Sequence, residues 1–88
     1  MIKVYMKKPL PVEVVQYDGT NGSFIYDWSN GKVVELEVNS YIPNMFLRIS
    51  TREGNMDAIE GCYIVKGAEG EFWAVQESIF EKTYEEVK

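Results

Sequence analysis

The chain has 88 residues, of which 45% are hydrophobic and 14% aromatic, and its formal net charge is −5. This length predicts a single domain over residues 1–88, and the hydrophobic content excludes a globally disordered chain. No apolar run approaches the roughly 20 residues that span a bilayer, and no secretory signal is visible, so we expect no membrane association. A lone cysteine, Cys62, excludes an internal disulfide and indicates a reducing cytosol.

The charge is distributed unevenly along the chain. Residues 1–50 carry five acidic and five basic side chains, whereas residues 51–88 carry nine acidic and four basic ones. An acidic surface repels the phosphate backbone, so we expect no direct nucleic-acid binding. The excess of acid suits a basic partner, or serves only solubility.

Two strands are predicted near the N-terminus. Residues 2–7 alternate, with Ile2, Val4 and Met6 on one side, which is typical of a half-buried strand. A proline-containing break follows, because proline cannot donate to a ladder of hydrogen bonds. Strand character resumes over residues 12–17 and ends in a turn rich in glycine and asparagine.

The secondary structure of the next segment is ambiguous, whereas that of the one after it is clear. Residues 23–29 favour a short helix with Ser23 as its cap, although the aromatic and β-branched content leaves a strand open as the alternative. Residues 32–38 alternate again and predict a strand whose apolar face carries Val34, Leu36 and Val38.

The clearest signal lies between residues 51 and 75. Residues 62–66 and 71–75 are short, apolar and rich in aromatic or β-branched residues, and the glycine-bearing connection 67–70 predicts a hairpin between them. A turn signal at Glu60 and Gly61 separates residues 55–59 from this hairpin. We therefore predict three strands in a meander.

The remaining segments complete a mainly β pattern. Residues 39–44 are expected to be a connection, 45–50 a strand, 76–81 a helical turn and 83–87 an edge strand. Together the pattern predicts a small antiparallel roll or barrel of about seven to eight short strands, with one or two helical turns.

Catalytic equipment is scarce in this composition. The chain has no histidine, which removes the commonest general base and most zinc sites. We expect Cys62 to be a buried packing residue, since free cysteine is among the most buried residue types. Glu53, Asp57 and Glu60 offer a carboxylate cluster for a metal-dependent hydrolase, but the spacing matches no EF-hand. We therefore expect no enzyme, catalytic residue, cofactor or metal.

Aromatic side chains provide the candidate interaction surface. Most of them are needed for the core of a small β domain. Trp28 and Trp73 are the ones we expect to be exposed, and exposed tryptophan is a common anchor of protein interfaces. The candidate interface therefore comprises Trp28, Tyr63, Glu69, Glu71 and Trp73.

Residues 61–87 resemble the C-terminal signature of a family of small uncharacterised proteins encoded by bacteriophages and prophages. That signature reads Gly-Asp-(Trp/Tyr)-Ile-(Ile/Val)-(Lys/Arg)-Gly, then Gly-Glu-Phe-(Tyr), then Phe-x-x-(Thr)-Tyr. These elements correspond to residues 61–67, 70–73 and 80–84, with Trp73 in place of the commoner tyrosine. The opening of the chain also resembles the family's start. Cys62 stands where the family has aspartate. The resemblance implies a phage or prophage product in the bacterial host cytoplasm, and it brings no activity with it.

Two functions are open on this basis. One is a non-enzymatic accessory protein that binds a host or phage protein. The other is an acidic mimic of nucleic acid that inhibits a DNA-binding host enzyme, which requires carboxylates on one continuous surface. The oligomeric state is open. The glutamates that such a mimic would use are Glu60, Glu69, Glu71, Glu77, Glu81, Glu85 and Glu86.

Overall fold

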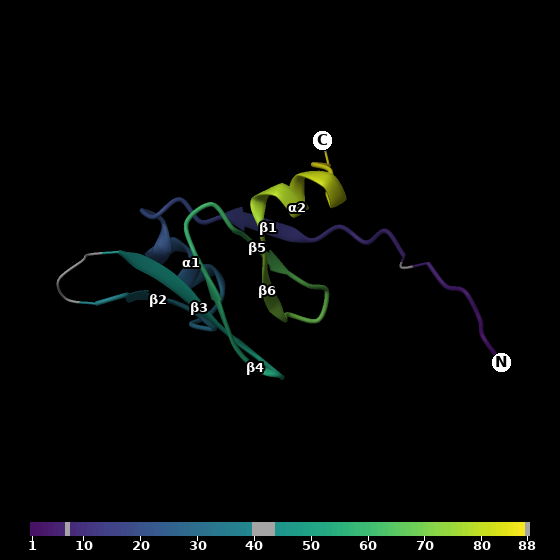
Figure 1. Cartoon of the computed structure of the whole chain (residues 1–88), viewed down its shortest axis with the longest axis horizontal. Helices are drawn as coiled ribbons and strands as arrows, with labels where there is room; N and C mark the ends of the chain where they lie inside the picture. The colour runs from purple at the N-terminus through teal and green to yellow at the C-terminus, as the bar shows by residue number, and fades with distance from the viewer. Residues whose placement is uncertain (7, 40–43, 88) are drawn as a thin grey trace.

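The computed structural model describes residues 1–6, 8–39 and 44–87, and this part of the chain is mainly β (Figure 1). Of the two short helices in the described residues, one lies between the first two strands and the other follows the last strand. The elements are, in order, β1 (Glu13–Gln16), α1 (Gly22–Trp28), β2 (Val33–Glu37), β3 (Met45–Thr51), β4 (Gly54–Ala58), β5 (Tyr63–Lys66), β6 (Phe72–Val75) and α2 (Glu77–Thr83).

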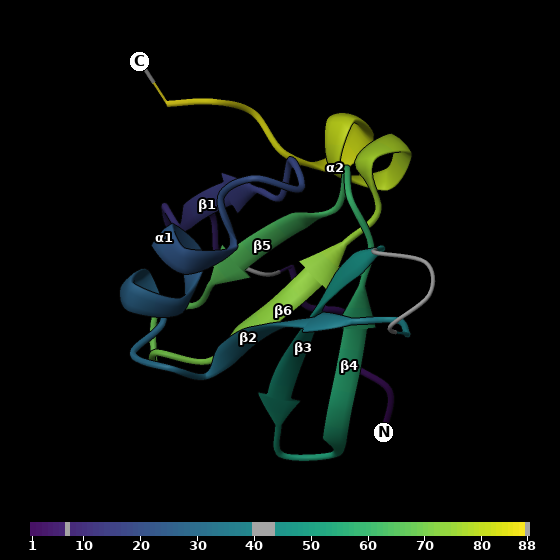
Figure 2. The ribbon, with the colours of Figure 1, turned by 90° about the vertical axis from the view of Figure 1, so that its left-hand side faces the viewer.

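The described strands form two antiparallel sheets. One has the order β1-β5-β6 and the other the order β2-β3-β4. Strand β6, at the edge of the first sheet, lies against β3 and β4 of the second sheet (Figure 2). The predicted small antiparallel β fold with short helices is thus confirmed. Six strands are found in the described residues in place of seven or eight, and the two sheets do not close into a barrel.

The predicted hairpin is confirmed, but the predicted meander is wrong. Strands β5 and β6 pair antiparallel with Val65 opposite Trp73. Strand β4, expected to continue into this hairpin, pairs instead with β3 in the other sheet. Gly61, with φ of +99°, lies in the turn between β4 and β5. A residue in this left-handed region turns the chain sharply, and here the turn carries it from one sheet to the other.

Both predicted terminal strands are absent from the described residues. Residues 1–6 of the predicted strand 2–7 form no strand, and Lys7 lies outside the described residues. At the other end α2 extends to Thr83, and residues 84–87 have no regular structure. Residues 2–6 do alternate in sequence, but neither of the two sheets formed by the described strands includes this segment, so it has no ladder of hydrogen bonds there.

The core lies between the sheets and α1. Helix α1 confirms the helical prediction for residues 23–29, although Asn21 and not Ser23 occupies the N-cap and no side chain caps the helix. In strand β2, Val33 is fully buried, whereas Val34 and Leu36 of the predicted apolar face are half-buried and Val38 beyond the strand is 55% exposed. Residues 40–43 of the predicted connection lie outside the described residues. The buried core cluster comprises Tyr17, Ile25, Val33, Leu47, Ile49, Ala58, Ile64 and Phe72.

At Gly67, which begins the β5–β6 loop, adding one methyl group is expected to lower the stability of the fold measurably. A Cβ at this buried position would lie 2.8 Å from Cζ3 of Trp73 and would overlap the Glu71 carboxylate. We expect Gly67→Ala to lower the free energy of unfolding by about 1–3 kcal/mol, because overpacking displaces the indole. Chemical denaturation of Gly67→Ala, Glu71→Ala and the double variant tests this. Full recovery in the double variant would contradict a clash with Trp73.

Candidate functional site

An open depression of about 670 Å³ lies where four segments meet. These segments are the end of β4, the turn that leads to β5, the end of β6 and the start of α2. Its lining combines apolar and acidic side chains from both sheets. The lining residues are Met56, Asp57, Ile59, Glu60, Gly61, Cys62, Ala74, Gln76, Glu77, Ser78 and Glu81.

A second depression, of about 450 Å³, adjoins the first. Three residues, Asp57, Ile59 and Glu60, line both. Because the two depressions share these walls, we treat them as one feature and call it the acidic groove. The second depression adds mainly apolar lining from the ends of β2 and β3. Its further residues are Val38, Asn44, Met45 and Phe46.

The floor of the acidic groove is apolar and partly open to water. Ile59 is 70% exposed and Met56 39% exposed, although both carry large hydrophobic side chains. Cys62 and Ala74 pack against the core and are half-buried, so the expected packing role of Cys62 is confirmed, although its burial is only partial. The Ala74 amide of β6 lies 3.3 Å from the Met56 sulfur of β4, which links the two sheets at the floor. An apolar side chain placed here would lose water contact, which favours binding.

Carboxylates surround this floor, and one of them, Asp57, forms an ion pair with an arginine side chain. Asp57 accepts two hydrogen bonds from Arg48, at 2.9 and 3.1 Å. The bond to Arg48 lowers the pKa of Asp57 below its usual value. Within residues 1–6, 8–39 and 44–87, Glu60, Glu77 and Glu81 form no ion pair. The groove therefore has a negative potential that would attract a cationic side chain.

Helix α2 contributes two of these carboxylates on a single face. Glu77 and Glu81 are four residues apart, and this spacing places them one above the other on an α-helix. Two like charges in this arrangement repel each other by about 0.2–0.5 kcal/mol. Gln16 donates a hydrogen bond of 3.1 Å to Glu77, but its neutral amide leaves the charge in place. A bound cation between the two glutamates would relieve the repulsion.

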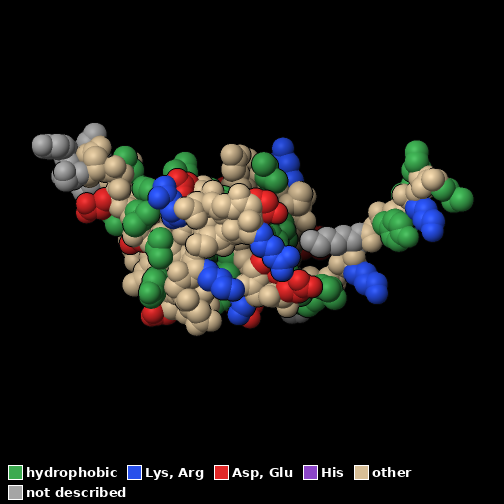
Figure 3. Space-filling view, turned by 90° about the horizontal axis from the view of Figure 1, so that it is seen from below, with side chains coloured by type: hydrophobic (Ala, Val, Ile, Leu, Met, Phe, Trp, Pro, Cys, Tyr) green, Lys and Arg blue, Asp and Glu red, His purple; other side chains and the backbone are tan. Residues whose placement is uncertain are grey.

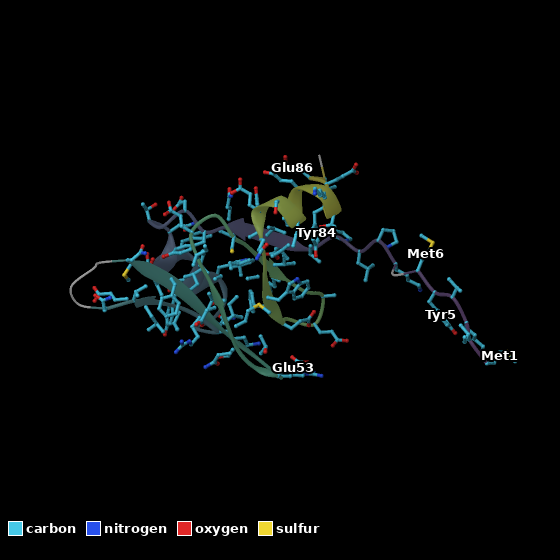
Figure 4. All side chains as sticks on the ribbon, viewed as in Figure 1. Met1, Tyr5, Met6, Glu53, Tyr84 and Glu86 are labelled. Carbon is cyan, nitrogen blue, oxygen red and sulfur yellow. The ribbon has the colours of Figure 1, made fainter. Side chains whose placement is uncertain are left out.

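Three stacked aromatic rings hold α2 in position beside the groove. The Phe80 ring stacks on Tyr63 of β5, with centroids 3.8 Å apart and planes 12° from parallel. Tyr84 stacks on the other side of Phe80, with centroids 4.6 Å apart. Figure 4 places Tyr84 beside α2. Since α2 has seven residues and no side-chain cap, these rings supply much of its attachment to the sheet.

A pair formed by the buried Tyr17 and the half-buried Glu35 lies elsewhere in the fold, and sequence reasoning did not find it. The Tyr17 hydroxyl donates a hydrogen bond of 2.5 Å to Glu35 on β2. Burial of the Tyr17 hydroxyl, and then its hydrogen bond to Glu35, raise the pKa of Tyr17 well above its usual value. Gly22 leaves room for the Glu35 carboxylate, because a Cβ there would overlap it. The pair ties the end of β1, α1 and β2 together.

The predicted interface residues are not brought together at the groove. Trp28 and Trp73 are half-buried, so the expectation that they are exposed is wrong. Trp28 packs edge-on against Phe72, and its indole donates to Glu13. Tyr63 belongs to the aromatic stack. Glu69 and Glu71 are exposed in or next to the β5–β6 loop, at the end of β6 away from α2 (Figure 1).

The carboxylate cluster suggested for a hydrolase does not assemble. Glu53 lies at the tip of the β3–β4 hairpin (Figure 4), and Asp57 is paired with Arg48. In the part of the chain that the structure describes, no group of three or more Cys, Asp or Glu side chains is arranged to hold a metal ion. Asp57 and Glu60 do line the groove, but their neighbours there are Glu77 and Glu81, which sequence reasoning had not grouped with them.

Comparison with protein-family models, with curated proteins and with solved structures gives no match. Among the described residues, no helix has the length and apolar character needed to cross a membrane. The geometry of the acidic groove is therefore the main basis for a functional proposal.

Proposed function

We propose that the protein is a non-enzymatic binding module that holds a basic, partly apolar segment of another protein in the acidic groove. The observation that carries this proposal is the apolar floor beside three carboxylates, Glu60, Glu77 and Glu81, that form no ion pair within the described residues. The resemblance of residues 61–87 to phage and prophage proteins supports the setting. In that setting the partner is a host or phage protein in the bacterial cytoplasm.

The two components of the groove have different roles in this binding. Exposed ion pairs contribute only about 0.2–1 kcal/mol each, so the carboxylates mainly select a cationic partner and speed its approach. Most of the affinity comes from covering the exposed side chains of Met56 and Ile59. A suitable ligand thus alternates apolar and basic residues.

The alternative of a nucleic-acid mimic has weaker support. Glu69 lies in the β5–β6 loop and Glu71 just before β6, whereas Glu77 and Glu81 follow this strand on α2. Figures 1 and 2 show the loop and α2 at opposite ends of β6. These carboxylates form two groups, and mimicry of a phosphate backbone needs one continuous row.

A peptide titration tests the proposed function. The probe is a short peptide alternating valine and lysine, and its controls replace lysine by glutamate or valine by serine. We expect the first peptide to shift the NMR signals of Ile59, Cys62 and Ala74, with an affinity that falls as salt is added. Either control peptide should bind at least about tenfold more weakly, because it lacks one of the two components.

Matched protein variants locate the binding site. Changing Glu60, Glu77 and Glu81 together to glutamine is expected to weaken binding about tenfold, because three weak charge interactions are lost. The same change at the exposed Glu53, Glu69 and Glu71 should leave the affinity unchanged. Equal losses in both triple variants, or no binding of the valine–lysine peptide, would contradict the proposal.

A further inference from the structure

The N-terminal arm is defined here as residues 1–8, of which the structure describes residues 1–6 and 8. These described residues project from the body of the molecule (Figures 1 and 3). Its apolar side chains are almost fully in water, with Ile2 94%, Val4 95% and Met6 91% exposed. Met1 and Tyr5 are similarly exposed, and Figure 4 shows both far from the sheets. An exposed apolar segment of this kind marks an interaction site.

The arm has the chemistry that the acidic groove would select. Ile2, Val4 and Met6 alternate with Lys3 and Tyr5, so an extended arm presents one wholly apolar side. Two further lysines, at positions 7 and 8, complete a sequence with three basic and no acidic side chains. Eight fully extended residues span about 26 Å. The apolar side of the arm is therefore long enough to cover more than one exposed side chain on the floor of the acidic groove.

We propose that the N-terminal arm of one copy of this chain binds in the acidic groove of a second copy. The apolar side of the arm covers Met56 and Ile59, and its lysines lie beside Glu60, Glu77 and Glu81. This inference rests on the proposed function and names the partner of the same groove. A heterologous contact of this kind closes into a ring or a reciprocal pair, or continues as a chain of copies.

Strand β1 separates the arm from the groove of its own chain. Glu13, at the start of β1, pairs with Lys66 beside the β5–β6 loop. Gln16, at the other end, donates hydrogen bonds to Gly61 and Glu77 at the groove. The arm therefore leaves from the Glu13 end of β1 (Figure 1), whereas the opposite end, at Gln16, contacts the groove residues Gly61 and Glu77.

The junction between the arm and β1 also favours binding to another copy. It contains Pro9 and Pro11, whose rings fix φ and make a short, stiff spacer. To reach its own groove the arm would have to reverse direction at this spacer and run back along the whole of β1. A second copy can present its groove to the arm without any such reversal.

A charge exchange between arm and groove tests the proposal on the full-length chain. The arm variant changes the lysines at 3, 7 and 8 to glutamate, and the groove variant changes Glu60, Glu77 and Glu81 to lysine. We expect the wild-type chain to self-associate in sedimentation velocity, and each variant alone to do so at least about tenfold more weakly. An equimolar mixture of the two should associate again, because the charges are complementary once more.

Cys62 reports whether the groove is covered, since it is the only thiol and lines the floor. We expect its reaction with a disulfide reagent to slow as the wild-type concentration rises, and the arm variant to show no such dependence. Slowing that is independent of concentration would mean that the arm binds its own chain, and would overturn the proposal. A groove variant that fails to fold is replaced by the triple glutamine variant, which should associate weakly.

Failure of this inference can be told apart from failure of the proposed function. If the wild-type chain stays monomeric while the valine–lysine peptide binds the groove, the second copy is not the partner and the binding module stands. Self-association that persists in both charge variants also overturns the inference. If neither the arm nor the peptide binds, both proposals fail.

Discussion

Tyr17→Phe is expected to lower the free energy of unfolding by about 2 kcal/mol, the range for losing a hydrogen bond to a charged group. Tyr17 is fully buried, and its hydroxyl donates to Glu35 at 2.5 Å. Phenylalanine fills the same space but leaves the Glu35 carboxylate without this donor. For a domain of this size the melting temperature should fall by on the order of 10 °C.

Two variants control for this measurement. Tyr26→Phe removes a hydroxyl from a side chain that is 50% exposed, and should change stability by less than about 0.5 kcal/mol. Glu35→Gln keeps an oxygen that can accept the Tyr17 hydrogen, so it should cost less than Tyr17→Phe. A Tyr17→Phe variant as stable as the wild type would show that the hydrogen bond contributes nothing.

The same pair predicts a loss of stability in alkali. Because burial and Glu35 raise the pKa of Tyr17 in the folded state, unfolded Tyr17 releases its proton first as the pH rises above about 10. The folded state then binds more protons than the unfolded state. The contribution of Tyr17 to the free energy of unfolding is therefore fully present below about pH 10 and declines above it. This one group lowers the free energy of unfolding by up to about 1.4 kcal/mol per pH unit.

Denaturant titrations at a series of pH values from neutral to alkaline check this dependence. The difference in the free energy of unfolding between the wild type and Tyr17→Phe should shrink as the pH rises, so the two curves of stability against pH converge. Parallel curves across the whole range would contradict a raised pKa for Tyr17.

Phe80→Ala is expected to lower the free energy of unfolding by about 2–3 kcal/mol, slightly less than for a fully buried phenylalanine. The ring lies between Tyr63 and Tyr84, so its removal breaks both stacking contacts at once. With seven residues, α2 has little stability of its own and should open locally. The acidic groove would then lose the fixed positions of Glu77 and Glu81.

Hydrogen exchange measures this opening directly. The amides of Phe80 and Tyr84 donate to Gln76 and Phe80 in the helix, and both should exchange faster in Phe80→Ala. Ile79→Ala is the matched control, since Ile79 lies in the same helix with its side chain 51% exposed. Equal effects of the two substitutions would show that the stack does not attach α2 to the sheet.

Local patterns in the sequence predicted the hairpin of β5 and β6, and helix α1, from neighbouring residues alone. The glycines at 67 and 70 set a turn between two apolar runs, and this information is complete within a few residues. The partner of β4 was predicted wrongly because strand pairing depends on where the chain goes after Gly61. The alternation of side chains in β4 would be the same whether this strand joined one sheet or the other, so the pattern does not identify its partner. The turn at Gly61 separates β4 from β5 and leaves them in different sheets.

The candidate site shows the same division. Sequence reasoning singled out Asp57 and Glu60 as a possible site but not Glu77 and Glu81, because the two pairs are far apart in the chain. It expected Trp28 and Trp73 to be exposed, whereas both are half-buried, and Trp28 packs against Phe72. How much of an aromatic ring is covered depends on residues distant in sequence, such as Phe72 beside Trp28.

The sequence by itself determined the β character, the positions of the tight turns and the charge of each half, because these follow from neighbouring residues and composition. Only the tertiary structure decided that the end of β4, the end of β6 and the start of α2 meet in an acidic groove, and that residues 1–6 stay outside the core. The physical reason is that burial and electrostatic potential depend on which distant segments pack together, and those contacts form only when the whole chain folds.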